Sequence, residues 1–445
     1  MAAPPGPQGG WFSAAASAFR DDQLVFYESC ARQYGDVVAT RLGPYRVWLI
    51  YHPDAIEEML VTRARDFLKS PGVRRNLRPL LGNGLLLSEG DFWLRQRRLA
   101  QPAFHRQRVA GYGDVMAGFT ERHVAGWADG ATLEIHGEMM ALTQAIVGKT
   151  LFDADVSGDA HDAAQAAKLL AENFGARLAR VTLPFWVPTP GNLRARRAIR
   201  RLDAIVNRII AERRAITDDR GDLLSMLVQA QDADDGTRMT PRQLRDEVMT
   251  IFLAGHETTA VTLSWTWYLL AQHPEARARL EAELRAALGG RPPAAEDLPR
   301  LTYTAAIVSE SMRLFPPAYG LGRQAACATT LSGYPVARGD IVIAPTWVVH
   351  RDRRWFDDPG EFRPERWADD LARRLPRFAY FPFGGGPRAC VGEQFAWMEG
   401  VLVIATIAQR WRVQHVPGHR VELSPRLTLR PKYGMKMTVS RRGTN

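Results

Sequence analysis

The stretch FPFGGGPRACVGEQFAWMEG, residues 381–400, decides how the rest of this sequence is interpreted. It places Cys390 in a tight loop, where a run of glycines at 384–386 lets the backbone bend sharply and approach a flat ligand. From Gly392 onward, apolar residues recur at helical spacing, which predicts a helix directly after the loop. Free N–H groups and the dipole at a helix N-terminus favour a thiolate. Cys390 is therefore suited to be a ligand to iron.

A lone cysteine can also be a small buried hydrophobic residue, and this is the alternative for Cys390. The local pattern favours a ligand, because it resembles the haem-binding loop F-x-x-G-x-R-x-C-x-G of the cytochrome P450 family at Phe383, Gly386, Arg388, Cys390 and Gly392. The resemblance implies that Cys390 is the proximal ligand of haem b and that Arg388 pairs with a haem propionate. In that family the thiolate donates electron density to iron and favours O–O cleavage.

The composition of the chain is that of one large globular protein. It has 445 residues, of which 46% are hydrophobic and 24% charged, with no linker, low-complexity block or repeat. The sequence shows no apolar run of about 18 residues and no secretory signal, so no membrane anchor is expected. We expect a single domain over residues 1–445, in which residues 1–20 form a loose N-terminal arm.

The cysteine content and the net charge indicate the redox compartment and the kind of binding partner. Cys30, Cys327 and Cys390 are too few and too scattered for a disulfide framework or a zinc site, which fits a reducing cytoplasm. A formal net charge of +10 would suit nucleic acid, but the chain has no nucleic-acid motif and no dense basic run. A basic face for an acidic protein partner is the favoured interpretation.

Two other parts of the chain match basic positions that bind haem propionates in the family. Trp93 and Arg97 are spaced i, i+4 and share one helical face. They resemble the family's W-x-x-x-R helix, although a solvated basic helix with a half-buried Trp is the alternative. Arg323, on a predicted strand, matches a further propionate-binding position. Arg95 and Arg98 lie off the face of Arg97 and are candidates for contact with a redox partner.

A long helix is predicted from Thr240-Pro241 to His273. Thr240 and Gln243 form a capping box, and Pro241 suits the first helical position. The centre of this helix is AGHETT, residues 254–259, in which a glycine and two threonines are poor choices for a helix interior. A local rule broken inside a long helix often marks function.

The AGHETT segment resembles the family's distal motif [A/G]-G-x-[D/E]-T. The resemblance implies that Ala254 leaves room over the haem face and that Glu257 and Thr258 form the acid–alcohol pair that assists proton delivery. The alternative is a kinked core helix in which Glu257 is paired elsewhere. We expect His256 to serve helix packing.

Other segments complete the resemblance. Glu310, Arg313 and Arg366 resemble the family's structural charge triad. Residues 68–90 have little periodicity and correspond to the roof of the substrate pocket. Arg74, Arg75 and Arg78 in this roof could anchor a substrate carboxylate, or they could be solvated loop residues.

From about residue 20 onward, the motifs follow the family's order, and the chain is identified as a member of the cytochrome P450 family. The resemblance implies a mainly α fold with a small β lobe, a triangular prism with haem between a long distal helix and a proximal Cys-loop helix. It also implies a haem-thiolate monooxygenase that inserts one oxygen atom from O₂ into a lipophilic substrate such as a fatty acid, terpenoid or steroid-like molecule.

The implied partners are a ferredoxin or flavodoxin and its NAD(P)H-dependent reductase, because the sequence shows no fused flavin or nicotinamide domain. A monomer is expected. Two alternatives stay open: a haem-thiolate enzyme that uses peroxide or rearranges its substrate, and a haem-binding sensor without turnover. The acid–alcohol pair argues against both.

Overall fold

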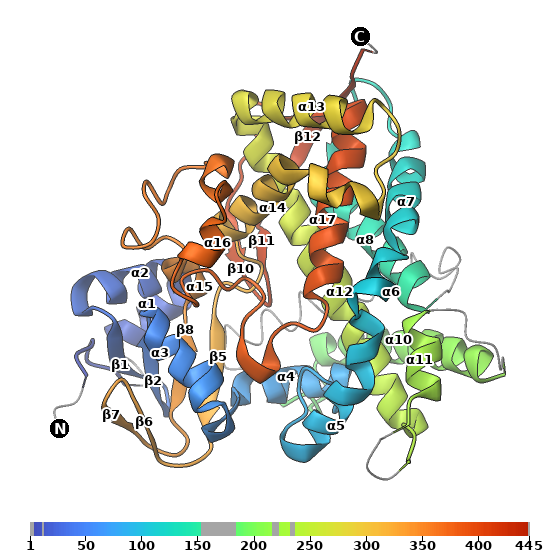
Figure 1. Cartoon of the computed structure of the whole chain (residues 1–445). Helices are drawn as coiled ribbons and strands as arrows, with labels where there is room; N and C mark the ends of the chain where they lie inside the picture. The colour runs from blue at the N-terminus through green and yellow to red at the C-terminus, as the bar shows by residue number, and fades with distance from the viewer. Residues whose placement is uncertain (1–3, 11–12, 153–183, 216–221, 232–235, 444–445) are drawn as a thin grey trace.

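The computed structural model describes residues 4–10, 13–152, 184–215, 222–231 and 236–443. These residues form a large helical region with a smaller β region on one side, and the whole has a triangular outline (Figure 1). The predicted mainly α fold with a small β lobe is confirmed. In the part of the chain that is described, no helix combines the length and apolar character needed to cross a bilayer.

The β region is built around a five-stranded sheet of order β1-β2-β8-β5-β3. The predicted hairpin is present, with antiparallel β1 and β2 joined by a turn in which Gly43 has a φ of 62°. Trp48 on β2 is fully buried, and its indole N–H donates to Asp340 at 2.9 Å. The strands are β1 (Val37–Leu42), β2 (Tyr45–Ile50), β3 (Phe67–Lys69), β5 (Leu321–Ala325) and β8 (Ile341–Ala344).

The expectation of a loose N-terminal arm is wrong for the described residues of this segment. The carbonyl of Pro5 accepts from the N–H of Ala39 at 3.0 Å, and that of Pro7 accepts from the Thr40 hydroxyl at 2.9 Å. The segment thereby covers the edge of β1, whose backbone groups would otherwise lack partners. It leads into α1 (Ala14–Asp21) and α2 (Gln23–Tyr34), which pack on the hairpin.

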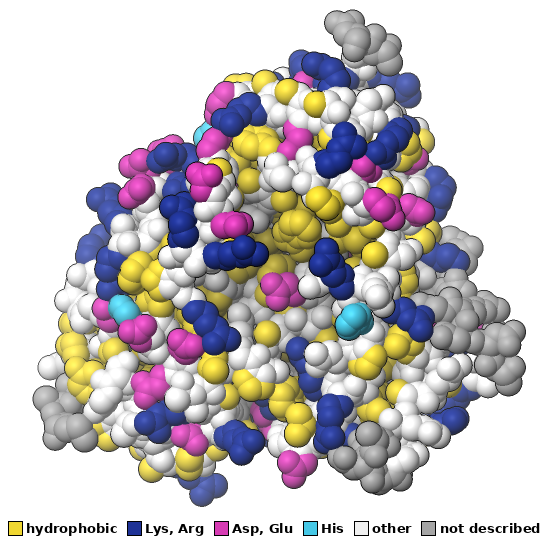
Figure 2. Space-filling model, viewed as in Figure 1, with side chains coloured by type: hydrophobic (Ala, Val, Ile, Leu, Met, Phe, Trp, Pro, Cys, Tyr) yellow, Lys and Arg dark blue, Asp and Glu magenta, His cyan; other side chains and the backbone are white. Residues whose placement is uncertain are grey.

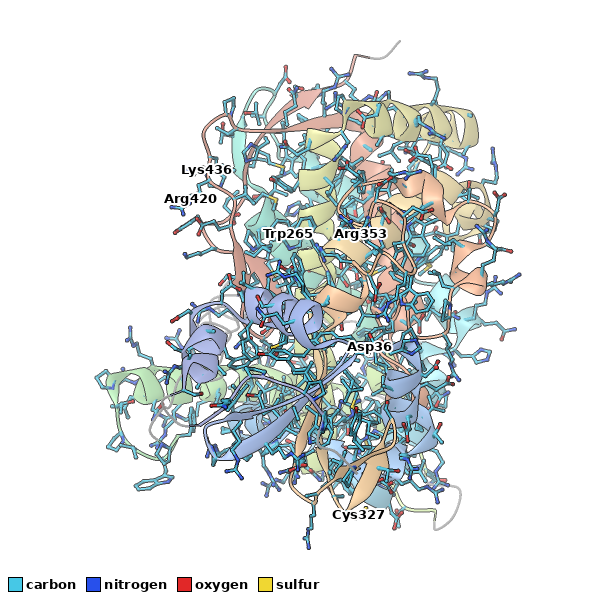
Figure 3. All side chains as sticks on the ribbon, turned by 90° about the vertical axis from the view of Figure 1, so that its left-hand side faces the viewer. Asp36, Trp265, Cys327, Arg353, Arg420 and Lys436 are labelled. Carbon is cyan, nitrogen blue, oxygen red and sulfur yellow. The ribbon has the colours of Figure 1, made fainter. Side chains whose placement is uncertain are left out.

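The helical region is organised around α12 (Pro241–Gln272), which carries the predicted capping box of Thr240 and Gln243. Figure 3 shows Trp265 of this helix inside the helical region, whereas Cys327 lies at the outside of the β region. Trp265 stacks on Phe315 with 4.4 Å between ring centroids. The helical region around α12 also contains α4 (Pro71–Leu81), α5 (Gly90–Ala100), α7 (Gly113–Ala125), α8 (Ile135–Phe152), α10 (Pro190–Arg214), α14 (Thr302–Leu314) and α17 (Glu393–Arg410).

Shorter elements connect these two regions. The remaining strands form three small sheets: one of order β4 (Thr132–Glu134), β12 (Lys436–Arg441), β9 (Trp411–His415), one of β10 (Leu423–Pro425) with β11 (Leu429–Pro431), and one of β6 (Thr329–Leu331) with β7 (Tyr334–Val336). The remaining α-helices are α3 (Pro53–Glu57), α6 (Arg106–Ala110), α11 (Leu223–Gln229), α13 (Pro274–Leu288), α15 (Thr346–Val349) and α16 (Leu371–Arg374).

The predicted structural charge triad is present and buried. Arg313 donates to both carboxylate oxygens of Glu310 at 2.8 Å, and Arg366 Nε donates to Glu310 Oε1 at 2.9 Å. Trp367, which the sequence motif did not mark, adds an indole N–H to Oε2 at 2.9 Å. A buried ion pair stabilises a fold only when its remaining hydrogen-bonding groups are satisfied, and the Trp367 indole satisfies one of them. The triad therefore links α14 to the segment of chain that leads to Cys390.

Candidate active site

The loop before Cys390 is held in its shape by glycines. Gly384 and Gly386 have φ values of 72° and 66°, a region that favours glycine. A Cβ on Gly386 would lie 1.9 Å from the carbonyl oxygen of Leu60, so no larger residue fits there without a backbone shift. The loop closes with the Cys390 N–H donating to the Phe383 carbonyl at 2.9 Å. Phe383 thus shapes the loop, while its side chain packs against the helical core and does not line the pocket.

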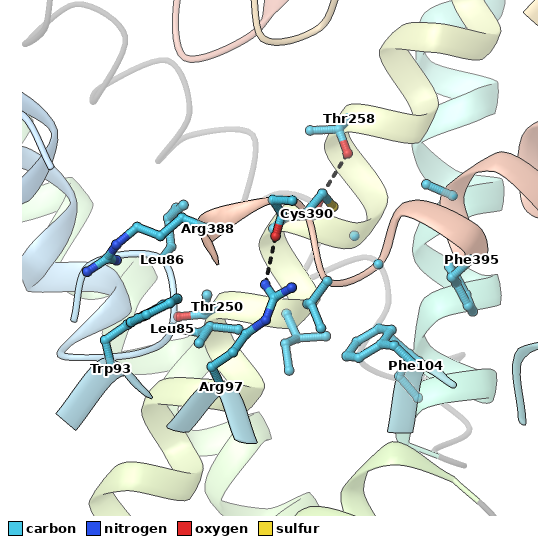
Figure 4. Close-up of a pocket in the computed structure, with 18 of the residues that line it drawn as sticks. Leu85, Leu86, Trp93, Arg97, Phe104, Thr250, Thr258, Arg388, Cys390 and Phe395 are labelled. Carbon is cyan, nitrogen blue, oxygen red and sulfur yellow. Dashed lines mark hydrogen bonds between the residues drawn. The ribbon is translucent and has the colours of Figure 1, made fainter. Parts of the chain in front are cut away.

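The Cys390 side chain faces a pocket between α12 and residues 383–390, here called the Cys loop (Figure 4). Most of its wall is apolar. The apolar side chains include Leu85, Leu86, Phe104, Leu151, Ile251, Ala254, Val391, Phe395 and Ala396.

The helix N-terminus alone does not make Cys390 a thiolate. The Cys390 side chain is open to the pocket, but the surrounding chain withdraws it from bulk water. This desolvation raises the pKa of the thiol and outweighs the opposing effects of a hydrogen bond from the Gly392 backbone and the charge of Arg97. A bound metal cation would supply the missing stabilisation, because a coordinating thiol is deprotonated. The protein contributes the position of the sulfur, and the metal would contribute the charge.

Basic side chains gather along one edge of the pocket, where Arg97 and Arg388 lie beside Trp93. Arg97 donates to the Ala389 carbonyl at 2.7 Å, which ties α5 to the Cys loop. Arg388 pairs with Glu89, donates to the Ser88 carbonyl at 2.9 Å, and stacks over the Trp93 ring at 4.3 Å. Trp93 therefore supports Arg388 and lines the pocket beside it.

Two further cations lie behind this edge. Arg323 is buried, and burial followed by the charge of Arg388 lowers its pKa to about 10. Lys69, which lines the pocket and pairs in register with Arg323, has a pKa well below its ordinary value for the same reasons. Glu89 opposes both shifts but does not balance them. No local sequence pattern marks Lys69, because the pairing of β3 with β5 joins segments that are far apart in the chain.

This arrangement fits haem. A thiol faces a largely apolar pocket, and Lys69, Arg97, Arg323 and Arg388 gather beside it. Within the described part of the chain, Glu89 is the one carboxylate that acts on Lys69, Arg323 and Arg388. Two additional carboxylates, as haem propionates provide, would relieve this excess of buried positive charge.

The distal wall of the pocket is formed by the predicted segment of α12. Ala254, Gly255 and Thr258 line it, and the Thr258 hydroxyl donates to the Ala254 carbonyl at 2.8 Å (Figure 4). A Cβ on Gly255 would lie 3.3 Å from Val147, so this glycine lets α8 pack close to α12. His256 is buried, and its Nδ1 lies 2.6 Å from the Phe252 carbonyl oxygen, as expected of a packing residue.

Glu257 does not meet Thr258 at the pocket. Its Oε1 accepts from the Thr428 hydroxyl at 2.6 Å and from Arg430 Nε at 3.0 Å, with Arg430 Nη2 at 2.7 Å. Glu257 is absent from the pocket wall. The alternative, in which Glu257 is paired elsewhere, describes this structure, although α12 runs through the segment as continuous helix without the break expected of a kink. The acid and the alcohol are neighbours in sequence but face different surroundings.

Other predicted arginines lie away from the pocket. Arg74, Arg75 and Arg78 lie on α4, a helix that the weak periodicity of residues 68–90 did not predict, and line a separate surface hollow. They do not line the pocket of Cys390, so the structure does not support the predicted carboxylate anchor. Arg95 donates to the hydroxyl and carbonyl of Thr237 at 2.7 and 3.2 Å, and so is engaged within the protein.

The fold and the site define a haem-thiolate protein, and residues 4–439 match the family model "Cytochrome P450". The chain belongs to the cytochrome P450 family and is a monooxygenase that inserts an oxygen atom from O₂ into a lipophilic substrate, with electrons from a redox partner. A sensor without turnover is excluded by this assignment. The solved structure of a "cytochrome P450DA heme domain" superimposes with a TM-score of 0.89 at 26% identity, over 100% of this chain and 98% of that one.

Three of the curated relatives to which the chain is similar come from Streptomyces. Cyclooctatin synthase of Streptomyces melanosporofaciens is 39% identical over 89% of this chain and 87% of its own length. Cyclooctat-9-en-7-ol 5-monooxygenase of the same organism is 39% identical over 86% of this chain and 84% of its own. Pentalenene oxygenase of Streptomyces avermitilis is 34% identical over 88% and 87%, respectively.

Proposed function

We propose that this monooxygenase hydroxylates a neutral terpenoid. The observation that carries the proposal is that relatives covering most of the chain are named for cyclooctat-9-en-7-ol and pentalenene. The pocket supports it. The wall residues from α12 and from residues 85–86 are apolar or hydroxylated, and the charged wall residues Lys69, Arg97 and Arg388 belong to the edge that suits haem propionates. A terpenoid needs no charged anchor, which this distal wall does not provide.

Cys390 would ligate the iron of haem b, and Arg97, Arg323, Arg388 and Lys69 would neutralise its propionates. Haem, when bound with an axial thiolate, supplies the activation of O₂. The chain's own contribution is to orient the substrate, exclude bulk water and control protons. Phe383 and the loop glycines hold the Cys390 sulfur at one wall of the pocket. Ala254 lies in the wall formed by α12, and its small side chain leaves space for a ligand.

We assign proton handling to Thr258 and Glu257. The Thr258 hydroxyl lies in the pocket wall and can release its bond to the Ala254 carbonyl to hold a water or a proton. Glu257 would serve as the acid behind it and must first loosen from Arg430 and Thr428. Donors of this kind contribute about 10² to 10⁴ in rate.

The electron donor would be a ferredoxin or flavodoxin with its NAD(P)H-dependent reductase. Figure 2 shows a hollow that exposes hydrophobic side chains on the face in front of α17, with Lys and Arg as well as Asp and Glu side chains around it. A groove beside the start of α17 is lined by Arg106, Trp397 and Glu393, among others. A single-domain, monomeric enzyme in the cytoplasm completes the proposal.

Spectral titration tests the substrate class. Pentalenene and cyclooctat-9-en-7-ol would be titrated into the haem-loaded protein beside a long-chain fatty acid and its methyl ester. We expect the terpenoids to bind and to be hydroxylated with a reductase system. We also expect the acid and the ester to bind alike, because no charged group anchors the acid. Tight binding of the acid alone, with no response to either terpenoid, would overturn the proposal.

A further inference from the structure

Two neighbouring acidic residues of α12, outside the pocket itself, hold a segment that forms its wall. Asp246 Oδ2 accepts from the N–H of Asn83 at 2.8 Å, and Glu247 Oε2 accepts from the N–H of Leu85 at 2.9 Å. Both carboxyl side chains are buried. Leu85 and Leu86 line the pocket, so these two bonds act directly on its wall.

The backbone of this segment packs closely against α12. A Cβ on Gly84 would lie 2.2 Å from the Thr250 hydroxyl and 2.5 Å from the Asp246 carbonyl oxygen, and one on Gly82 would lie 2.1 Å from the Asp246 carboxylate. At its other end, the Ser88 carbonyl accepts from Arg388 of the Cys loop at 2.9 Å. Residues 83–88 therefore span from the distal helix to the Cys loop.

Glu247 also holds α5. Its Oε1 accepts from the buried Gln96 side chain at 2.9 Å, one residue before Arg97. Both partners of Glu247 are donors, so the ionised carboxylate suits them best. Among the charged groups around it, Asp246 is adjacent on α12 and is itself paired with Arg245, which also bonds Asp203 of α10. The α5 side presents the neutral Gln96, whose Oε1 accepts from Arg95 Nη1 at 3.3 Å, while Arg95 Nη2 donates to the Thr237 hydroxyl.

We propose that Asp246 and Glu247 are positioning residues, which fix Leu85 and Leu86 as the pocket wall and so determine which carbon of the substrate is presented for oxidation. This inference rests on the proposed terpenoid hydroxylation for its substrate, but the clamp itself does not. Protonation of Glu247 turns one acceptor oxygen into an O–H that faces a donor, and loosens the wall.

Burial raises the pKa of Glu247 to about 7, while the bonds from Gln96 and Leu85 oppose the shift and Asp246 adds to it. The wall is therefore tighter above about pH 7 and looser below it. Glu247→Gln removes this titration while keeping an oxygen that can accept from Leu85.

Hydrogen–deuterium exchange of the amides at Asn83 and Leu85 tests the clamp without substrate. We expect faster exchange by about tenfold or more in Asp246→Asn and Glu247→Leu, because charge-assisted bonds are lost. Exchange at Leu85 in the wild type should slow as pH rises through about 7, after correction for intrinsic rates, and should lose this step in Glu247→Gln. Glu399→Gln serves as the control, because it changes a carboxyl that is also fully buried but lies on α17. It should leave the exchange rates at Asn83 and Leu85 unchanged.

Binding and product analysis test the positioning role. In the wild type, the dissociation constant of pentalenene should fall as pH rises from about 6 to about 8, and Glu247→Gln should make it independent of pH and broaden the set of hydroxylated carbons. The carbon monoxide spectrum should stay that of the wild type, which separates positioning from loss of the haem site. If no terpenoid binds the wild type, the proposed substrate class fails while exchange still decides the clamp. Unchanged exchange in Asp246→Asn and Glu247→Leu, or unchanged products and pH dependence with a bound terpenoid, would overturn the inference.

Discussion

Thr258 and Thr259 are adjacent on α12 but face different surroundings. The Thr258 hydroxyl lies in the pocket wall, whereas that of Thr259 donates to the Gly255 carbonyl at 3.1 Å and lies against the buried carboxyl of Glu399. We predict that Thr258→Ala keeps haem and substrate but yields less product and more peroxide per NAD(P)H consumed, because a proton-carrying group is lost. Thr259→Ala is the matched control and should stay coupled. Equal coupling in both variants would remove Thr258 from proton delivery.

Arg430 and Glu257 form a largely buried pair, in which the side chains are 15% and 8% exposed. Arg430→Met leaves the Glu257 carboxylate with Thr428 as its remaining hydrogen-bond donor, so we predict a loss of about 3 to 5 kcal/mol in the free energy of unfolding. Arg279→Met, which breaks an exposed pair with Glu365, should cost about 1 kcal/mol or less. Denaturant titration would measure both, and a similar small cost for the two variants would contradict the buried-pair account.

Among the structural elements, the loop before Cys390 owes its backbone shape to Gly386 in particular. We predict that Gly386→Ala folds but retains little haem, because a Cβ there meets the Leu60 carbonyl at 1.9 Å and φ is 66°. Gly118→Ala, in α7 with its nearest neighbour 3.5 Å away, should retain haem and gain about 0.5 to 1 kcal/mol of stability. The ratio of haem to protein absorbance reports the difference. Full haem content in Gly386→Ala would show that the loop tolerates a shift.

Local signals explain which elements were predictable. The capping box of α12, the glycine turn of the β1–β2 hairpin and the spacing of Glu310 and Arg313 are all encoded within a few residues, and each prediction is confirmed. Residues 4–10 lie along the edge of β1 and are held there by backbone hydrogen bonding. Such contacts do not depend on the pattern of side chains, so the sequence did not predict them. Lys69 and the bond from Arg430 to Glu257 join segments far apart in sequence, so they emerge only from the packed structure.

At the scale of the whole molecule, the net charge of +10 should steer an acidic electron donor. Arg106 is exposed on α6 beside the groove at α17, and so it replaces Arg95 as the candidate contact. We predict that first-electron transfer slows with ionic strength, since the Debye length falls to about 8 Å at 0.15 M salt, and that Arg106→Glu slows it and weakens the salt dependence. Arg20→Glu makes the same charge change on α1 and should act little. Stopped-flow rates of first-electron transfer that change neither with salt nor in Arg106→Glu would contradict a docking face at this groove.

The most direct test of the central claim is the spectrum of the reduced carbon monoxide complex in the wild type and in cysteine variants. Cys390 alone of the chain's cysteines faces the pocket, whereas Cys30 is buried in the β region and Cys327 lies at the surface. We expect the red-shifted Soret band of thiolate ligation in the wild type, Cys30→Ala and Cys327→Ala, and its loss in Cys390→Ala. Persistence of that band in Cys390→Ala would contradict the assignment of Cys390 as the ligand and, with it, the proposed chemistry of the site.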